Sequence, residues 1–210
     1  GTGDYSISLW VKLGDVTGNQ ILCSKGGWAF QQEGFSFYAS GALFSGQVRD
    51  SSNNVVTMGG NTSIFSGTWY HVVMTIDQTV DQLVRLYINS NEETNTGNMN
   101  SVGADLDGTS TWCLGARNGE TGPADRFLNG NIDEVIVAKG HCFTQAEITE
   151  LYNSGSPANP EDHSAFANMT AYYRMGDDDN DDETTMIDQI GSNNLTGVNL
   201  EAGDIEADTP

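Results

Sequence analysis

Hydrophobic and polar residues alternate in short runs along the first two thirds of the chain. In the run 5–13, one face carries Tyr5, Ile7, Leu9, Val11 and Leu13, and the other carries Ser6, Ser8, Trp10 and Lys12. A period of two predicts a strand with one buried face. Similar runs predict strands at 20–25, 28–32, 34–38, 42–49, 55–58, 69–77, 82–89 and 111–116. The long polar stretch 91–108 predicts a mobile loop.

The pattern changes after residue 127. The turn signal Asn129-Gly130 opens a run, 131–138, that has aliphatic residues on both faces, which predicts a strand buried on both sides. The segment 143–152 then follows a helical period, and Thr144 with Glu147 forms a capping box. The sequence therefore predicts an all-β fold, a two-sheet antiparallel jelly-roll sandwich with one short helix near 144–153.

Several segments together resemble one family. The stretch LNGNIDEVIVAKGHCFTQAEITELYNSG is similar to the closing strand and short helix of the laminin G-like, concanavalin A-like lectin/glucanase jelly rolls. YSISLWVKL, GTWYHVVMTID, VRLYINS and CLGAR resemble earlier strands of that family, although Ser90 stands where a glycine is usual. The resemblance extends from Tyr5 to about Gly155.

The composition shifts after this region. We expect residues 1–155 to form the laminin G-like β-sandwich, and 156–210 to be a linker and a C-terminal segment that completes the same sandwich. The alternative is a truncated second repeat. The C-terminal segment, with YYRMGD and IGSNN, resembles a tail that recurs in laminin G-like structural proteins of bacteriophages.

The charge is strongly negative. A net charge of −21 argues against nucleic acid or an anionic membrane as partner, and no stretch is apolar enough for membrane insertion. The odd set Cys23, Cys113 and Cys142 argues against a disulfide framework, although one bridge from Cys23 or Cys113 stays open. A chain that folds in a reducing cytosol and carries a lectin-like sandwich suggests a virion component.

Catalytic residues are not recognisable. The resemblance implies that a glucanase would carry three carboxylates at alternate positions of one strand, and no such triplet occurs. Asp133 and Glu134 are adjacent, so we expect them on opposite faces. His71, His141 and His163 have no serine or cysteine partner at a recognisable elbow. The sequence therefore predicts a protein that is not an enzyme.

Calcium is a possible structural cofactor, because oxygen-rich loops suit this hard cation. The acidic run 177–183 offers Asp177, Asp179 and Asp181, and its alternative interpretation is a solvated loop tip. The family resemblance implies a second candidate, in which Asp133 and Asp188 share an ion with carbonyl groups near Gly191.

Glycans bind through exposed aromatic rings beside polar groups. We expect Trp10, Trp69 and Trp112 to pack in the core, which leaves Trp28 and Tyr38 as the freest aromatic residues and candidate sugar contacts.

These observations predict a non-enzymatic structural protein of the virion surface with a lectin-like fold. It would be a phage head decoration, a fibre or a tail-associated protein. Its partners would be other virion proteins, further copies of itself or a cell-surface glycan. The alternative is an extracellular adhesin module, secreted or on the cell surface, that binds carbohydrate. A glycoside hydrolase is a distant third.

Overall fold

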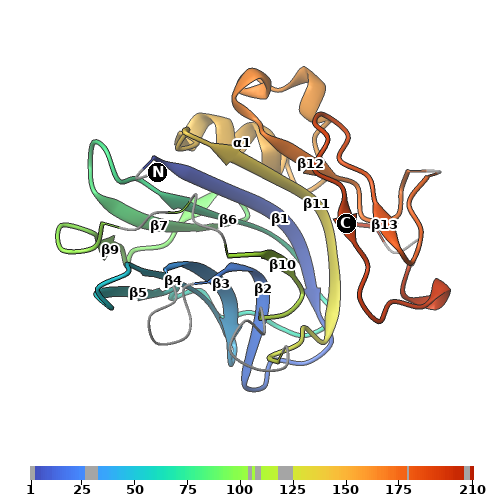
Figure 1. Ribbon diagram of the computed structural model, residues 1–210, viewed down its shortest axis with the longest axis horizontal. Helices are drawn as coiled ribbons and strands as arrows, with labels where there is room; N and C mark the ends of the chain where they lie inside the picture. Colours follow the sequence, from blue (N-terminus) through green and yellow to red (C-terminus); the bar gives the residue numbers. More distant parts are fainter. Residues whose placement is uncertain are drawn as a thin grey trace.

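Two antiparallel sheets pack face to face in the computed structural model (Figure 1), which describes residues 3–26, 33–103, 106, 110–117, 125–178, 180–205 and 209–210. The first sheet has seven strands in the order β12-β11-β1-β6-β7-β8, with β9 also paired to β7. The second has five strands in the order β10-β2-β3-β4-β5. The predicted fold class, a two-sheet antiparallel jelly roll, is confirmed.

The bounds of the strands agree with most of the predicted runs. The seven-stranded sheet contains β1 (Tyr5–Leu13), β6 (Trp69–Ile76), β7 (Leu83–Ile88), β8 (Asn91–Glu92), β9 (Gly97–Asn98), β11 (Gly130–Lys139) and β12 (Ala171–Tyr173). The five-stranded sheet contains β2 (Asn19–Lys25), β3 (Gly34–Ser40), β4 (Leu43–Arg49), β5 (Val55–Gly59) and β10 (Trp112–Leu114). The strand predicted at 28–32 lies outside the described residues.

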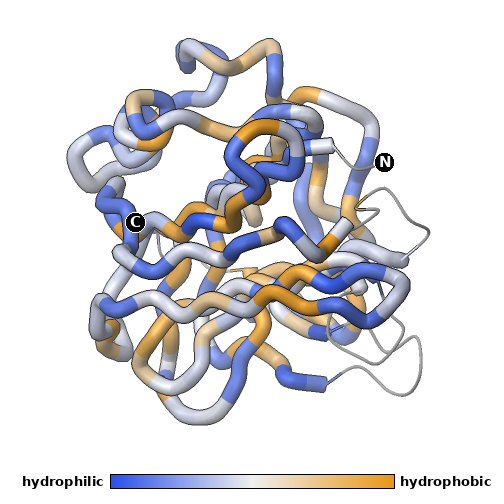
Figure 2. Tube along the Cα trace, turned by 90° about the vertical axis from the view of Figure 1, so that its left-hand side faces the viewer, coloured by the Kyte–Doolittle hydropathy of each residue, from blue (hydrophilic) through white to orange (hydrophobic). Residues whose placement is uncertain are grey.

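The main core lies between the two sheets. Ile7 and Leu9 of β1 and Phe35 and Phe37 of β3 belong to one core cluster, and all four are fully buried. Figure 2 shows hydrophobic segments along the strands and hydrophilic segments at many of the turns. The alternation read from the sequence is therefore the alternation between core and outer surface.

The outer face of the seven-stranded sheet, turned away from the five-stranded sheet, is covered by α1 (Gln145–Tyr152) and the short helices η1 (Pro160–Asp162) and η2 (Phe166–Asn168) (Figure 1). The Thr144 side chain accepts a hydrogen bond from the backbone N–H of Glu147, and the Glu147 side chain accepts one from the N–H of Thr144. This capping box confirms the predicted start of the helix.

A β-bulge interrupts the pairing of β1 with β11. Ser8 lies opposite Ile136 but Trp10 lies opposite Asp133, so β11 contains one extra residue, and Glu134 has a φ of 51°. The bulge places Glu134 in a pocket beneath α1 together with Trp10. Asp133 lies directly opposite Trp10 in the strand pairing, so both acidic residues lie on the outer face of the sheet. The prediction that Asp133 and Glu134 point to opposite faces is therefore wrong.

The stretch 91–108 is more ordered than predicted. It contributes β8 and β9, and Glu93 is 3% exposed. The Glu93 carboxylate accepts hydrogen bonds from the N–H groups of Asn61 and Thr62 and from the Thr62 hydroxyl. Residues 91–103 are thus a loop with two short strands, held against its neighbours by buried polar contacts, and its mobility stays a prediction.

The C-terminal segment lies beside β11. β12 pairs with β11 at the sheet edge, with Val135 opposite Tyr173, and Tyr173 reaches the main core. Beyond it are a small sheet of β13 (Thr185–Met186) and β14 (Leu195–Thr196) and the short helix η3 (Ala202–Asp204). The division of the chain at residue 155 stays a prediction.

No helix among the described residues has the length and apolar character needed to cross a membrane.

Candidate functional site

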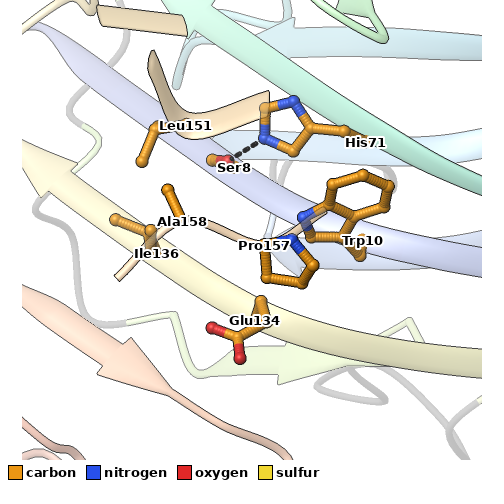
Figure 3. A pocket seen from close by; sticks show the side chains of 8 residues that line it. All are labelled: Ser8, Trp10, His71, Glu134, Ile136, Leu151, Pro157 and Ala158. Atoms are coloured by element: carbon orange, nitrogen blue, oxygen red, sulfur yellow. Dashed lines mark hydrogen bonds between the residues drawn. The ribbon is translucent and has the colours of Figure 1, made fainter. Parts of the chain in front are cut away.

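A small pocket lies beneath α1 on the outer face of the seven-stranded sheet (Figure 3). Its lining consists of Ser8, Trp10, His71, Glu134, Ile136, Leu151, Pro157 and Ala158. Its volume of about 10 Å³ suits one water molecule. At this volume the pocket is too small for a sugar or another substrate molecule, and Leu151 of α1, Pro157 and Ala158 form part of its wall.

Ser8 and His71 form a hydrogen bond in this pocket, with 2.8 Å between Ser8 Oγ and His71 Nε2 (Figure 3). The imidazole packs against Trp10 at 5.3 Å and Tyr152 at 6.0 Å between ring centroids. Burial lowers the pKa of His71 to about 3, so the ring is neutral near neutral pH. The sequence analysis missed this pair because its residues lie on different strands. Both are buried, so the pair anchors the packing of α1 and offers no accessible nucleophile.

An acidic cluster surrounds the bulge. Burial, followed by the charge of Glu134, raises the pKa of Asp133 to about 7. Burial also raises the pKa of Glu134, although the hydroxyl of Tyr172 donates a hydrogen bond to its carboxylate. The charge of Asp177 acts on both carboxylates, and Asp177 lies 3.6 Å from the Arg174 guanidinium. The structure thus brings Asp133 into electrostatic contact with Asp177.

Asp188 has a different environment. Its carboxylate accepts hydrogen bonds from the N–H groups of Tyr172, Ile190, Gly191 and Asn193, at 3.0 to 3.3 Å. Gly191 therefore contributes an N–H donor to Asp188. Both carboxylate oxygens are directed at the turn that follows Asp188.

The acidic run folds in a similar way. Asp181 accepts hydrogen bonds from the N–H groups of Gly176 and Ile187, at 2.9 and 2.6 Å. Asp179 lies outside the described residues. Within the described part of the chain, no group of three or more His, Cys, Asp or Glu side chains has an arrangement that could hold a metal ion. Calcium binding stays a prediction.

The two aromatic candidates have different outcomes. Tyr38 lies in the middle of β3 and is 6% exposed, so the expectation of a freely exposed ring is wrong. Burial raises the pKa of the Tyr38 hydroxyl, and this hydroxyl forms a hydrogen bond with the Ser45 side chain on β4. The bond to the neighbouring strand is consistent with a ring that lies against the sheet. Trp28 lies outside the described residues. Trp10 and Trp112 pack as predicted, with Trp112 in edge contact with Phe35 at 5.0 Å.

A larger hollow, here called the rim pocket, lies at the end of the sandwich where β6 leads into β7. Its volume is about 330 Å³. It is lined by Gln78, Gln82, Met99, Asn100, Ser101, Val102 and Gly103. These residues come from the turn between β6 and β7 and from the segment after β9. None of these described lining side chains carries a charge, and most present amide or hydroxyl groups.

The first loop of the rim pocket is fixed by Asp77. Its carboxylate accepts hydrogen bonds from the N–H groups of Thr79, Val80 and Asp81, at 2.9 to 3.1 Å. Burial raises the pKa of Asp77, but these bonds outweigh burial and lower it overall. The carboxylate therefore stays ionised and holds the turn closed.

The second loop is tied to the first. The N–H of Met99 donates to the carbonyl of Gln82 at 2.8 Å, and the N–H of Val102 donates to the carbonyl of Met99 at 2.9 Å. The Asn98 side chain accepts from the N–H of Asn100 at 2.9 Å. The sequence analysis missed this pocket, and the amides at 78, 82, 98 and 100 were the signal that could have pointed to it.

A jelly roll with a helix over one sheet and a polar hollow at one end defines a lectin-like β-sandwich. The chain belongs to the Laminin_G_3 family of the concanavalin A-like lectin/glucanases superfamily, whose sequence profile matches residues 1–149. A comparison with curated proteins found no match.

Solved structures with the same fold include a Bacteroides ovatus protein assigned to carbohydrate binding, at a TM-score of 0.70 and 14% identity. The match covers 93% of this chain and 52% of that protein, so the chain spans about half of its length. The CBM40 module of the Ruminococcus gnavus IT-sialidase, solved with α2,3-sialyllactose, matches at a TM-score of 0.61 and 17% identity, over 71% of this chain and 83% of the module.

The ligand-binding domain of botulinum neurotoxin serotype D, solved with N-acetylneuraminic acid, matches at a TM-score of 0.52 and 15% identity. That match covers 73% of this chain and 37% of the toxin domain. Identities this low show the common fold alone.

Proposed function

We propose that this protein binds carbohydrate without cleaving it. The observation that carries the proposal is the rim pocket, an open hollow of about 330 Å³ whose lining offers uncharged hydrogen-bonding groups. Sugars present many hydroxyl groups that both donate and accept, so amide and hydroxyl side chains on a firm scaffold suit them. The carbohydrate-binding proteins among the fold neighbours support the same class of function.

Hydrolysis is disfavoured by the position of the carboxylates. Glycosidases need two carboxyl groups on either side of an accessible glycosidic bond, about 5–9.5 Å apart. Among the described residues, no carboxylate lines the rim pocket. Asp133 and Glu134, whose pKa values are raised, lie instead at the bulge beside a pocket closed by α1.

A glycan array tests the proposal. The full chain is applied to the array with calcium and, separately, with EDTA, and the same glycans are incubated with the protein and analysed for released sugars. We expect retention of a defined set of glycans and no release. Retention in calcium alone would additionally support a calcium cofactor. Release of sugar at catalytic rates, or no retention under either condition, would refute the proposal.

A place on the virion surface is a separate proposal. It is supported by the resemblance of the C-terminal segment to tails of bacteriophage structural proteins, and the extracellular adhesin module is its alternative. Mass spectrometry of purified particles from the source of this sequence tests it. Detection of the chain in the particles would support it, and detection only in the culture medium or on cells would favour the adhesin.

A further inference from the structure

We propose that the rim pocket binds one uncharged sugar unit of a glycan through the amide groups of Gln78, Gln82 and Asn100. This inference rests on the proposed carbohydrate function and assigns to it a place and a ligand class. Four features of the pocket carry it: its size, the orientation of Gln78, the charge around it and the bonds that hold it.

The size of the rim pocket favours a single unit. Sites for small molecules have volumes of about 300–1,000 Å³, and the rim pocket lies at the lower end of that range, at about 330 Å³. Met99 and Val102 are 3% and 5% exposed, so they form an apolar floor. The lining thus combines two buried apolar side chains with amide groups, a composition that suits a ring with one apolar face and hydroxyl groups at its edge.

Gln78 has a fixed orientation. Its side-chain Nε2 donates to the carbonyl of Gly3 at 2.8 Å, and its backbone N–H donates to the Asp4 carboxylate at 2.9 Å. Because a carbonyl accepts and cannot donate, Nε2 must face Gly3, and Oε1 must face the other way. Oε1 is buried and has no hydrogen-bond donor among the described residues.

An acceptor in this state is costly, since it has lost water without gaining a donor. Gln78 lines the rim pocket, but Oε1 is covered in the unliganded structure, so a sugar hydroxyl can donate to it only if the side chain moves when the ligand binds. The orphaned acceptor therefore points to a ligand that brings donors, as sugar hydroxyl groups do.

The charge around the rim pocket disfavours acidic sugars. Its lining has no Lys, Arg or His, while the loop beside it carries Asp77 and Asp81. Arg85 is engaged by Asp81, at 2.6 Å. A carboxylate ligand would lose its hydration without gaining a cationic partner, which costs free energy. The net charge of −21 would also repel it. The pocket thus selects uncharged sugars, in contrast to the sialic acid seen in two of the fold neighbours.

The rim pocket is formed before a ligand arrives. The Met99 to Gln82 backbone bond joins its two loops, and Asp77 and Asn98 close the turns on either side. Less ordering is then required on binding, which favours affinity from few contacts.

Gly103 allows the site to be blocked without strain. A Cβ atom added there meets no atom of the described residues within 4 Å, so Gly103→Phe adds bulk to the pocket wall. Gly203 has equally open surroundings but lies in η3, among the last residues of the chain, which makes Gly203→Phe the matched control. Asn100→Ala removes one lining amide, and Asn168→Ala, in η2, is its control.

Isothermal titration of the full chain tests the inference with the methyl glycosides of galactose, glucose, mannose and N-acetylglucosamine, and with N-acetylneuraminic acid. We expect one or more of the neutral glycosides to bind, and N-acetylneuraminic acid not to bind. Asn100→Ala should weaken binding by about fivefold or more, as the loss of one hydrogen bond predicts, and Gly103→Phe should abolish it. Both controls should bind like the wild type.

The outcomes separate the two proposals. Neutral sugar binding that survives both Gly103→Phe and Asn100→Ala would overturn the rim pocket as the site and leave the carbohydrate function standing. Binding of N-acetylneuraminic acid in preference to the neutral glycosides would overturn the ligand class. If neither the glycosides nor any glycan on the array binds, the proposed function fails, and this inference fails with it.

Discussion

The Tyr172 hydroxyl donates a hydrogen bond to the carboxylate of Glu134, and so joins the C-terminal strand β12 to the bulge in β11. Glu134 sits there with a φ of 51°, a backbone conformation that costs energy for a residue with a side chain. Burial, followed by this bond to Glu134, raises the pKa of Tyr172, so the phenol stays protonated. The bond connects residues 38 positions apart.

Removal of this hydroxyl should destabilise the protein. In Tyr172→Phe the partly buried Glu134 carboxylate loses its donor, and we expect the free energy of unfolding to fall by about 1–3 kcal/mol. Urea denaturation measures the change. Glu134→Ala, which removes the acceptor, completes a double-mutant cycle, in which a coupling energy near zero would show that the two side chains do not interact.

Asp133 should make stability depend on pH. Its pKa in the folded protein is about 7, raised first by burial, against an ordinary value of 3.8. Between these values the folded state binds more protons than the unfolded state, so stability falls as pH rises from about 4 to about 7. In Asp133→Asn this loss disappears, and we expect a gain of order 3 kcal/mol at pH 8 relative to the wild type. Urea denaturation at pH 4.5 and pH 8 measures it, and an equal effect at both pH values would contradict the assignment.

His71 should act in the opposite direction. Burial lowers its pKa from 6.5 to about 3 in the folded protein, so below pH 6.5 the unfolded state binds more protons than the folded state. Stability is therefore lost as pH falls through 6.5 towards 3. Between pH 4 and 6.5 the effects of His71 and Asp133 partly cancel.

The two effects can be separated by substitution. Asp133→Asn should reveal a rise in stability with pH over this interval, and His71→Gln should reveal a fall. Melting temperatures at half-unit steps of pH measure both slopes. If both variants show the same slope as the wild type, neither group titrates as assigned.

The sequence predicted the layout well where one signal dominated. Period-two alternation located most strands, and the capping box of Thr144 and Glu147 located the start of α1. The bulge was not predictable, because such a left-handed position usually carries glycine and here carries Glu134. The bulge also explains why the predicted orientation of Asp133 and Glu134 was wrong.

Features assembled from distant segments were also missed. Ser8 and His71 lie 63 positions apart, and their pairing depends on the register of β1 against β6. The rim pocket needs two loops to meet, through a bond between Met99 and Gln82. Tyr38 was predicted to be free because the tryptophans at 10, 69 and 112 were assigned to the core, but only the neighbouring strands determine whether a ring on a sheet is covered.

Asp188 should contribute to stability in the same way with and without calcium. Asp188 is 5% exposed, and the N–H groups of Tyr172, Ile190, Gly191 and Asn193 donate to its carboxylate. Asp188→Ala leaves these donors without an acceptor, so we expect a loss of about 2–5 kcal/mol. Asp178→Asn, at an exposed turn, is the control and should change stability by less than about 0.5 kcal/mol.

The effect of calcium on stability distinguishes Asp188 as an acceptor for backbone N–H groups from Asp188 as a metal ligand. Because the Asp188 oxygens are already engaged by N–H donors, the difference in melting temperature between calcium and EDTA should be the same in Asp188→Asn and in the wild type. This variant keeps one oxygen that can accept from Tyr172, Ile190 and Gly191, so it perturbs the turn less than Asp188→Ala does. Differential scanning fluorimetry measures both differences. A calcium-dependent rise that is present in the wild type and lost in Asp188→Asn would make Asp188 a calcium ligand, and the turn would then have to rearrange around the ion.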